Sequence, residues 1–220
     1  MSSGGVTKTV MSTSTIVVTK CLSGCPQTPV SQPALPATTL ITQVSTLPSA
    51  SAGACPARLS AGQYEYPHLI IPVSSHEPET AFGTSYNGTI NSVVSSIFNF
   101  DIPASDAGKT CSLIFLLPRQ TELTTSAFEL TGSGGFDISL LKAPATVQTT
   151  YNSVPQTGIY MPEHLGGPSG VAPGNEYVIT SGPCAAGQRI GYLVAATGTL
   201  NLNYFQDYNP SAIGFYITVC

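Results

Sequence analysis

The chain has 220 residues, of which only 8% are Asp, Glu, Lys or Arg, compared with about 25% in typical soluble proteins. Its formal net charge of -4 and its seven Lys and Arg residues give it no electrostatic footprint for nucleic acid or for an anionic membrane surface. No run approaches the ~18 apolar residues of a membrane span, and the length suits one domain plus an extension. We therefore expect no nucleic-acid partner and no membrane span.

Residues 1–54 differ in composition from the rest of the chain. They are rich in Ser, Thr, Pro and Ala, and they lack the periodicity of a packed helix or strand. Their prolines favour extended, polyproline-like conformations. We interpret this segment as a disordered stalk or linker, O-glycosylated or unmodified, that precedes a single domain at residues 55–220.

The N-terminus lacks a secretion signal that other features lead us to expect. A signal peptide contains roughly 7 to 15 apolar residues in succession, whereas the longest apolar run near the start is Ile16-Val17-Val18. The glycosylation sequon Asn87-Gly88-Thr89 and six cysteines nevertheless favour an oxidising compartment. We expect a secreted, extracellular or cell-wall protein whose signal peptide is not present in this chain; the alternative is a protein that is not secreted.

From residue 64 onward, apolar and polar residues alternate with the period of two that half-buried strands require. The clearest cases are Phe98, Phe100 and Ile102; Phe136, Ile138 and Leu140; Ile190, Tyr192 and Val194; Leu200, Leu202 and Tyr204; and Ile213, Phe215 and Ile217. Residues 113–117 are apolar throughout, which predicts a central strand covered on both faces. About eight to ten short strands predict an all-β fold, an antiparallel β-sandwich, with a closed barrel as the alternative.

Two glycine-containing segments are interpreted as hairpin turns. Ser133-Gly134-Gly135 lies between Phe128-Glu129-Leu130 and the strand that begins at Phe136, and Thr197-Gly198 lies between the strand 190–196 and the strand 200–204. Glycine supplies the positive φ that such turns need. The turn-rich segment 143–175 is longer than usual connections, which predicts an ordered surface loop or a lid.

The six cysteines are disulfide candidates: Cys21, Cys25, Cys55, Cys111, Cys184 and Cys220. Cys21 and Cys25 are close enough in sequence to form a local bridge. The remaining four allow three pairings. Because Cys55 and Cys220 bracket the domain, and domain termini often lie close together, we favour Cys55 with Cys220 and Cys111 with Cys184.

Groups suited to catalysis or metal binding are few, and the chain contains no phosphate-binding or dinucleotide-binding motif. His68 lies in a predicted strand, where a structural role is favoured. His76, Glu77 and Glu79 could ligate a metal together, but Pro78 favours an exposed acidic loop. Carboxylates for glycoside hydrolysis could come from Asp101, Glu129, Asp137, Glu176 or Asp207, and nothing in the sequence selects a pair. We predict no metal, no cofactor and no catalytic residue.

The segment YFQDYNP (204–210) carries the clearest binding chemistry. Aromatic faces stack on the apolar C–H faces of a sugar ring, while amides and carboxylates hold its hydroxyls. The candidate glycan contacts are Tyr204, Asp207, Tyr208 and Asn209. The competing interpretation is structural, because Tyr204 continues the inward face of Leu202 and the residues that follow suit a turn.

Several blocks of the sequence resemble a known fungal family. They are YEYPHLIIPV (64–73), TAFGTSYNGT (80–89), SSIFNFDIPASDAGKTCSLIFLLP (95–118), GSGGFD (132–137), VAPGNEYVIT (171–180) and YFQDYNPSAIGFYITVC (204–220). In order and spacing they are similar to the C-terminal domain of the ubiquitin-three-binding protein, type two ("But-two"), over residues 57–220. The resemblance implies a secreted or wall-associated protein with no established catalytic activity. The family name also implies a link to the activating enzyme of a ubiquitin-like modifier.

The sequence therefore predicts a secreted, cell-wall-associated, non-catalytic β-sandwich that contacts wall polysaccharide or a wall protein. The first alternative is an intracellular protein-interaction module that binds the activating enzyme of a ubiquitin-like modifier. The second is a wall-polysaccharide hydrolase, which would need two carboxylates that converge in a cleft.

Overall fold

The computed structural model describes residues 53–156 and 164–220, all of which belong to one compact unit, Pro48–Cys220. The predicted stalk, including Cys21 and Cys25, therefore lies almost entirely outside the described residues. The strands are β1 (Tyr64–Glu65), β2 (Leu69–Ser74), β3 (Asn87–Ile90), β4 (Val94–Asp101), β5 (Thr110–Leu117), β6 (Phe128–Thr131), β7 (Phe136–Leu140), β8 (His164–Gly166), β9 (Asn175–Pro183), β10 (Arg189–Ala196), β11 (Asn201–Phe205) and β12 (Gly214–Val219). One short α-helix, α1 (Ser153–Gln156), follows β7, and two 3-10 helices lie at Ala104–Asp106 and Gln120–Glu122.

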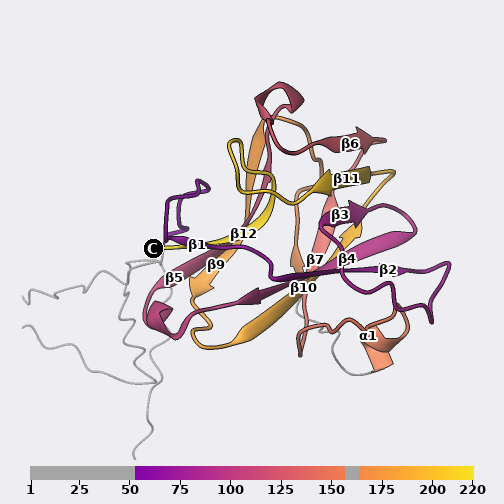
Figure 1. Ribbon diagram of the computed structural model, residues 1–220, viewed down its shortest axis with the longest axis horizontal. Coiled ribbons are helices and arrows are strands. Elements are labelled where there is room, and N and C mark those ends of the chain that lie inside the picture. Colours follow the sequence, from indigo (N-terminus) through magenta and orange to yellow (C-terminus); the bar gives the residue numbers. More distant parts are fainter. Residues whose placement is uncertain (1–52, 157–163) are drawn as a thin grey trace, which may run out of the picture. The chain divides into compact units, whose positions relative to one another are not determined.

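These strands form three antiparallel sheets (Figure 1). The first has the order β1-β12-β5-β9, the second β2-β4-β10-β7-β8 and the third β3-β11-β6. The predicted all-β, antiparallel fold is confirmed. The described residues hold more strands than expected because β1, β3, β6 and β8 have only two to four residues each. Strands this short offer few positions for an alternation, although Phe128, Glu129 and Leu130 of β6 do alternate.

One hydrophobic core lies between the first sheet and the other two. Phe115 and Phe215 of the first sheet meet Phe136 of the second, with ring centroids 4.7 to 5.4 Å apart. Leu202 of the third sheet belongs to the same buried cluster. The residues that the alternation predicts to face inward form this core. The sandwich therefore follows from the sequence pattern.

The outer faces of the two larger sheets are also partly covered. Ile114 and Tyr216 of the first sheet pack against Leu59 and Tyr64 from the start of the domain. Val73, Ile71 and Ile97 of the second sheet form a cluster with Leu141, Ala145 and Val154, which follow β7. Covered on both faces, β5 is the central strand that the uninterrupted apolar run predicts.

Neither predicted hairpin forms. β6 pairs with β11 and β7 pairs with β10, so the two members of each supposed hairpin belong to different sheets. Ser133-Gly134-Gly135 and Thr197-Gly198 are instead bends, at which two adjacent strands pass together from the third sheet to the second. The Thr197 N–H donates to the Gly135 carbonyl (2.8 Å), and the Thr199 N–H donates to the Ser133 carbonyl (2.7 Å).

Gly132→Ala is expected to destabilise this bend much more than Gly62→Ala destabilises its own turn. Both glycines have a φ of 73°, a conformation that costs other residues about 1–2 kcal/mol. A Cβ at Gly132 would also lie 1.9 Å from the Thr199 carbonyl oxygen, whereas a Cβ at Gly62 meets nothing within 4 Å. We expect losses of about 1 kcal/mol at Gly62 and about 3 kcal/mol at Gly132 in urea denaturation. Equal losses of stability at the two glycines would contradict the close approach of the Thr199 carbonyl to Gly132.

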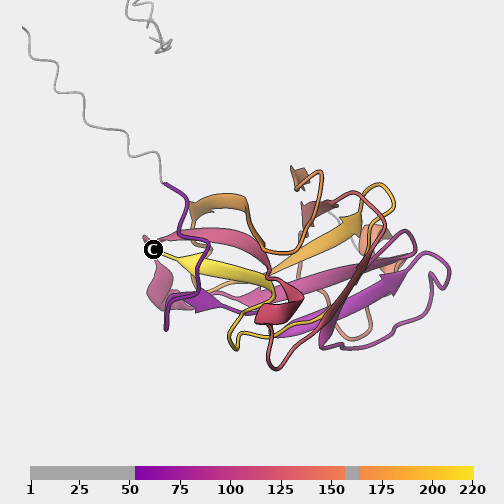
Figure 2. The same cartoon turned by 90° about the horizontal axis from the view of Figure 1, so that it is seen from above.

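Two disulfides join the cysteine pairs that the sequence favours. Cys55 is bonded to Cys220, with their Cα atoms 5.6 Å apart, and Cys111 is bonded to Cys184, with theirs 4.8 Å apart. The first bond brings the start of the described chain to the C-terminus, as Figure 1 and Figure 2 both show. The second connects β5 with the residue that follows β9.

The long segment 143–175 is only partly among the described residues. β8 pairs with β7 at the edge of the second sheet, and Val154 of α1 is buried against that sheet's outer face. The described part of the predicted loop therefore covers the second sheet. Within residues 53–156 and 164–220, no helix is long and apolar enough to span a membrane.

Candidate functional site

A groove with several aromatic side chains is formed by three chain segments that are distant in sequence. Residues 66–70, 84–86 and 205–208 line it, together with Tyr216. Its volume is about 490 Å³, within the ~300–1,000 Å³ that is typical of ligand sites. We call it the aromatic groove.

Backbone hydrogen bonds hold these segments side by side. The Ser85 N–H donates to the Ile70 carbonyl (2.8 Å), and the Gln206 N–H donates to the Tyr86 carbonyl (3.0 Å). The Gln206 side chain adds two bonds of 3.0 Å to the backbone of Phe215 in β12. Because the backbone is fixed in this way, the groove needs little ordering to receive a ligand.

Four exposed aromatic side chains stand in two pairs along the groove. The rings of Tyr66 and Tyr208 are stacked, and those of Tyr86 and Phe205 are tilted by 37°; the centroids are 6.3 Å apart in both pairs. The exposed fractions of Tyr66, Tyr208, Tyr86 and Phe205 are 58%, 59%, 79% and 39%. Exposed aromatic side chains gathered around one hollow are typical of a binding surface.

Asp207 fixes the turn that carries Tyr208. One of its carboxylate oxygens accepts a hydrogen bond from the Thr125 hydroxyl (2.6 Å), and the other accepts one from the Asn209 N–H (3.0 Å). Burial alone would raise the pKa of Asp207, but these hydrogen bonds hold it below its ordinary value. Asp207 is therefore a carboxylate that positions the turn.

Asp207→Asn is expected to cost about 1–2 kcal/mol of stability at pH 7, because the amide offers N–H groups where the carboxylate accepted hydrogen bonds. A lowered pKa stabilises the folded state above the unfolded pKa of about 3.9, and this contribution is lost as the pH falls through the folded pKa. In urea unfolding, the wild type should therefore lose stability more steeply than the variant below about pH 4.

Glu129→Gln, at an exposed position of β6, is the control and should retain the wild-type pH dependence. Parallel pH profiles for Asp207→Asn and the wild type would show that the hydrogen-bonded carboxylate contributes nothing.

Comparison with known proteins places the chain in a family. Residues 65–210, well over half of the chain, match the family described as ubiquitin 3 binding protein But2 C-terminal domain. The chain belongs to this family. No match is found among curated proteins or among solved structures. The matched part of the But2 domain includes every residue that lines the aromatic groove except Tyr216.

Only part of the predicted glycan-contact set is accessible in the But2 domain. Tyr208 and Asn209 are exposed on the turn. Tyr204 is 1% exposed and its ring lies 5.6 Å from that of Phe115 in the core, so its prediction as a ligand contact is wrong. Asp207 lines the groove, but it is buried and already bonded to Thr125 and Asn209.

Sequence reasoning missed three of the four exposed rings. For Phe205 a signal was present, because a residue that follows an inward-facing Tyr204 in a strand faces outward. Tyr66 and Tyr86 reach the groove from distant segments, and no local pattern places them there. The family match contains all three but assigns none of them a role.

His68 lies at the same groove, just before β2. Its Nδ1 is 3.4 Å from one carboxylate oxygen of Asp101, and Arg189 contacts the other oxygen at 2.6 Å. Burial lowers the pKa of His68, and the opposing effect of Asp101 does not reverse this. The imidazole is therefore neutral at pH 7.

The other chemical candidates are distributed over the domain. Glu79 accepts a hydrogen bond from the Asn152 side chain (2.6 Å), and the described residues contain no group of three His, Cys, Asp or Glu that could hold a metal. The five carboxylates considered for hydrolysis, Asp101, Glu129, Asp137, Glu176 and Asp207, lie in or beside five different strands. The Arg189 hydrogen bond lowers the pKa of Asp101, whereas a general acid for hydrolysis needs a raised pKa.

Asn87, the predicted glycosylation site, begins β3 next to Tyr86. Its side chain is half-buried, and its Nδ2 donates to the Asn203 side-chain oxygen (2.8 Å). A sugar attached to Nδ2 leaves one N–H on that nitrogen, which is enough for this bond. Glycosylation at Asn87 is thus compatible with the pairing of β3 and β11, and it stays a prediction.

Proposed function

We propose that this But2-domain protein is secreted, associates with the cell wall, and holds a wall polysaccharide in the aromatic groove without cleaving it. The observation that carries the proposal is the presence of two pairs of exposed aromatic rings along one groove. A pyranose ring has apolar faces that stack on such rings and polar edges that bind water or protein. Two stacking sites in one groove suit an extended sugar chain better than a single sugar.

The charges around the groove favour a neutral polysaccharide. Apart from tyrosines, His68 and Asp207 are the titratable residues among those described as lining it. His68 is neutral at pH 7, and the Asp207 carboxylate is bonded to Thr125 and Asn209. Arg189, which lies near His68, is paired with Asp101. An acidic glycan would therefore find no free cation in the groove to bind its charge.

Extracellular location is supported by the disulfides and by the sequon. The domain contains two disulfides, which are rare in cytosolic proteins. Asn87 combines the sequon with a position at which a sugar can be attached. The family description names binding to ubiquitin 3, and this supports the intracellular alternative. A measurement on the native protein, given below, distinguishes that alternative from secretion.

Isothermal titration calorimetry with laminarihexaose and chitohexaose tests the groove. We expect the wild type to bind at least one of these neutral oligosaccharides and to leave it uncleaved. The double variant Tyr66→Ala with Tyr86→Ala removes one ring from each pair, and it should bind at least about tenfold more weakly, a loss of about 1.4 kcal/mol. Tyr151→Ala is the matched control, since Tyr151 is 40% exposed but does not line the groove.

Undiminished binding by the double variant, or no binding of either sugar by the wild type, would rule out the aromatic groove as a glycan site. Release of new reducing ends would favour the hydrolase alternative instead.

Mass spectrometry of the native protein, alkylated without reductant, tests the compartment. We expect a glycan on Asn87 and intact disulfides. Unmodified Asn87 together with free thiols at Cys111 and Cys184 would favour the intracellular protein-interaction module.

A further inference from the structure

A second pocket lies between the two layers of the sandwich and shares no residue with the aromatic groove. Its volume is about 310 Å³. It lies at the side where β9 is the last strand of the first sheet and β8 is the last strand of the second. These two edge strands are not hydrogen-bonded to each other, so the sandwich is not closed there.

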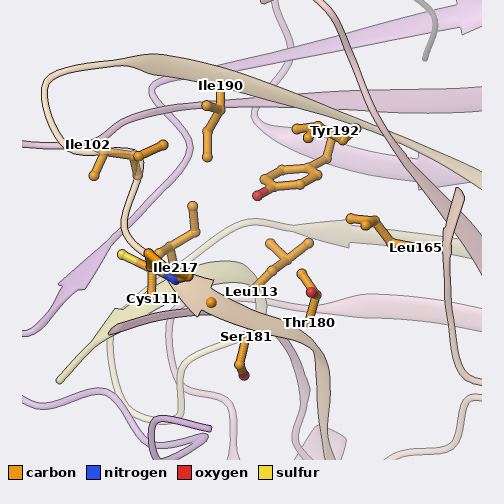
Figure 3. A pocket seen from close by; sticks show the side chains of 13 residues that line it. Ile102, Cys111, Leu113, Leu165, Thr180, Ser181, Ile190, Tyr192 and Ile217 are labelled. Atoms are coloured by element: carbon orange, nitrogen blue, oxygen red, sulfur yellow. The ribbon is translucent and has the colours of Figure 1, made fainter. Parts of the chain in front are cut away.

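Apolar side chains from both layers form the walls of this pocket (Figure 3). Leu113 and Ile217 of the first sheet lie opposite Ile190 and Tyr192 of the second, and Leu165 of β8 stands at one end. The Tyr192 hydroxyl is directed toward the middle of the pocket in Figure 3.

The size of this space suits a small ligand. The pocket is partly open to solvent, so an apolar ligand that enters it would remove apolar side chains of both layers from water. About 310 Å³ is at the lower end of the range of small-molecule sites. A compact apolar ligand would therefore complete the contacts that the two sheets do not make with each other.

The lining of the pocket disfavours an ionised ligand. None of the described residues that line it carries a charge. Of the described cations nearest in sequence to the lining, Lys109 lies 2.9 Å from Asp106, Arg189 lies 2.6 Å from Asp101, and Lys142 is exposed and does not line the pocket. A carboxylate in this pocket would lose part of its hydration without meeting a cation among the described lining residues, which is unfavourable.

We propose that this pocket binds a neutral molecule that consists mainly of an alkyl chain and carries a hydroxyl group. The chain would contact the Leu and Ile side chains of both layers, and the hydroxyl would meet the Thr180 hydroxyl. This inference is independent of glycan binding, because the two sites have no residue in common.

Titration with 1-decanol and with decanoate, both below their aggregation limits, tests the proposal by calorimetry. The wild type is expected to bind 1-decanol at least tenfold more tightly than decanoate. Thr180→Phe fills the pocket from β9 and should weaken 1-decanol binding at least tenfold. Val178→Phe is the control, since Val178 is 46% exposed on the same strand and does not line the pocket.

A measurement on the unaltered protein covers the case in which Thr180→Phe does not fold. In NMR spectra of the wild type, 1-decanol should shift the resonances of Leu113, Ile190 and Tyr192 and leave those of Tyr66 and Tyr86 unchanged. Absence of binding, equal affinity for decanoate, undiminished binding by a folded Thr180→Phe variant, or shifts confined to the aromatic groove would each overturn the proposal.

Discussion

Phe115→Ala is expected to destabilise the domain by about 3–5 kcal/mol, which is a large part of the stability of an ordinary domain. Phe115 is fully buried in the central strand β5, and its ring lies within 4.7 to 6.2 Å of the rings of Phe136, Tyr177, Tyr204 and Phe215. Alanine would leave a cavity that residues from three sheets surround. Because the neighbours are strand residues held by backbone pairing, they cannot collapse to fill it.

Urea denaturation followed by circular dichroism measures this loss, and Phe82→Ala provides the matched control. Phe82 is 41% exposed, so the same truncation there should cost less than about 1 kcal/mol. Similar losses at the two positions would show that the core is not centred on Phe115.

Removing either disulfide should have an effect of similar size. The chain-entropy model gives about 5 kcal/mol for the bond between Cys55 and Cys220, which closes a separation of 165 residues, and about 4 kcal/mol for the bond between Cys111 and Cys184, which closes one of 73. Loss of the first bond also frees the segment that covers Ile114 and Tyr216. We therefore expect the larger destabilisation for Cys55→Ala with Cys220→Ala.

The reductant dithiothreitol provides a test that needs no variant. It should lower the urea midpoint of the wild type and have no further effect on a variant that lacks all four described cysteines. If the reductant leaves the wild-type midpoint unchanged, the disulfides do not stabilise the domain.

Much of the fold can be predicted from the sequence because strand alternation is a local property. The inward positions of β4, β7, β10, β11 and β12 follow from period two alone, and the uninterrupted run in β5 correctly indicates a strand covered on both faces. The hairpins could not be predicted in this way. Whether Gly134 ends a strand or bends it depends on its long-range partner, Thr197, which lies between β10 and β11. The local composition is the same in both cases.

The candidate site was predictable only in part, for a related reason. The segment 204–210 does contribute to the aromatic groove, but alternation places Tyr204 in the core and Phe205 at the surface. The stacking partners of Phe205 and Tyr208 are Tyr86 and Tyr66, and the sheet pairing that brings them together is non-local. A linear sequence shows which aromatic residues exist and leaves open which of them share a surface.

Saturation-transfer NMR on the intact protein with laminarihexaose and chitohexaose tests the central claim most directly. The chain contains no Trp, so its aromatic protons come from Phe, Tyr and His alone. If the groove holds a neutral polysaccharide, saturating the rings of Tyr66, Tyr86, Phe205 and Tyr208 will reduce the signals of the C–H protons on the sugar faces, and the Tyr66→Ala, Tyr86→Ala variant will lose this transfer. Transfer that persists in the double variant, or none from the wild type to either sugar, would contradict the claim.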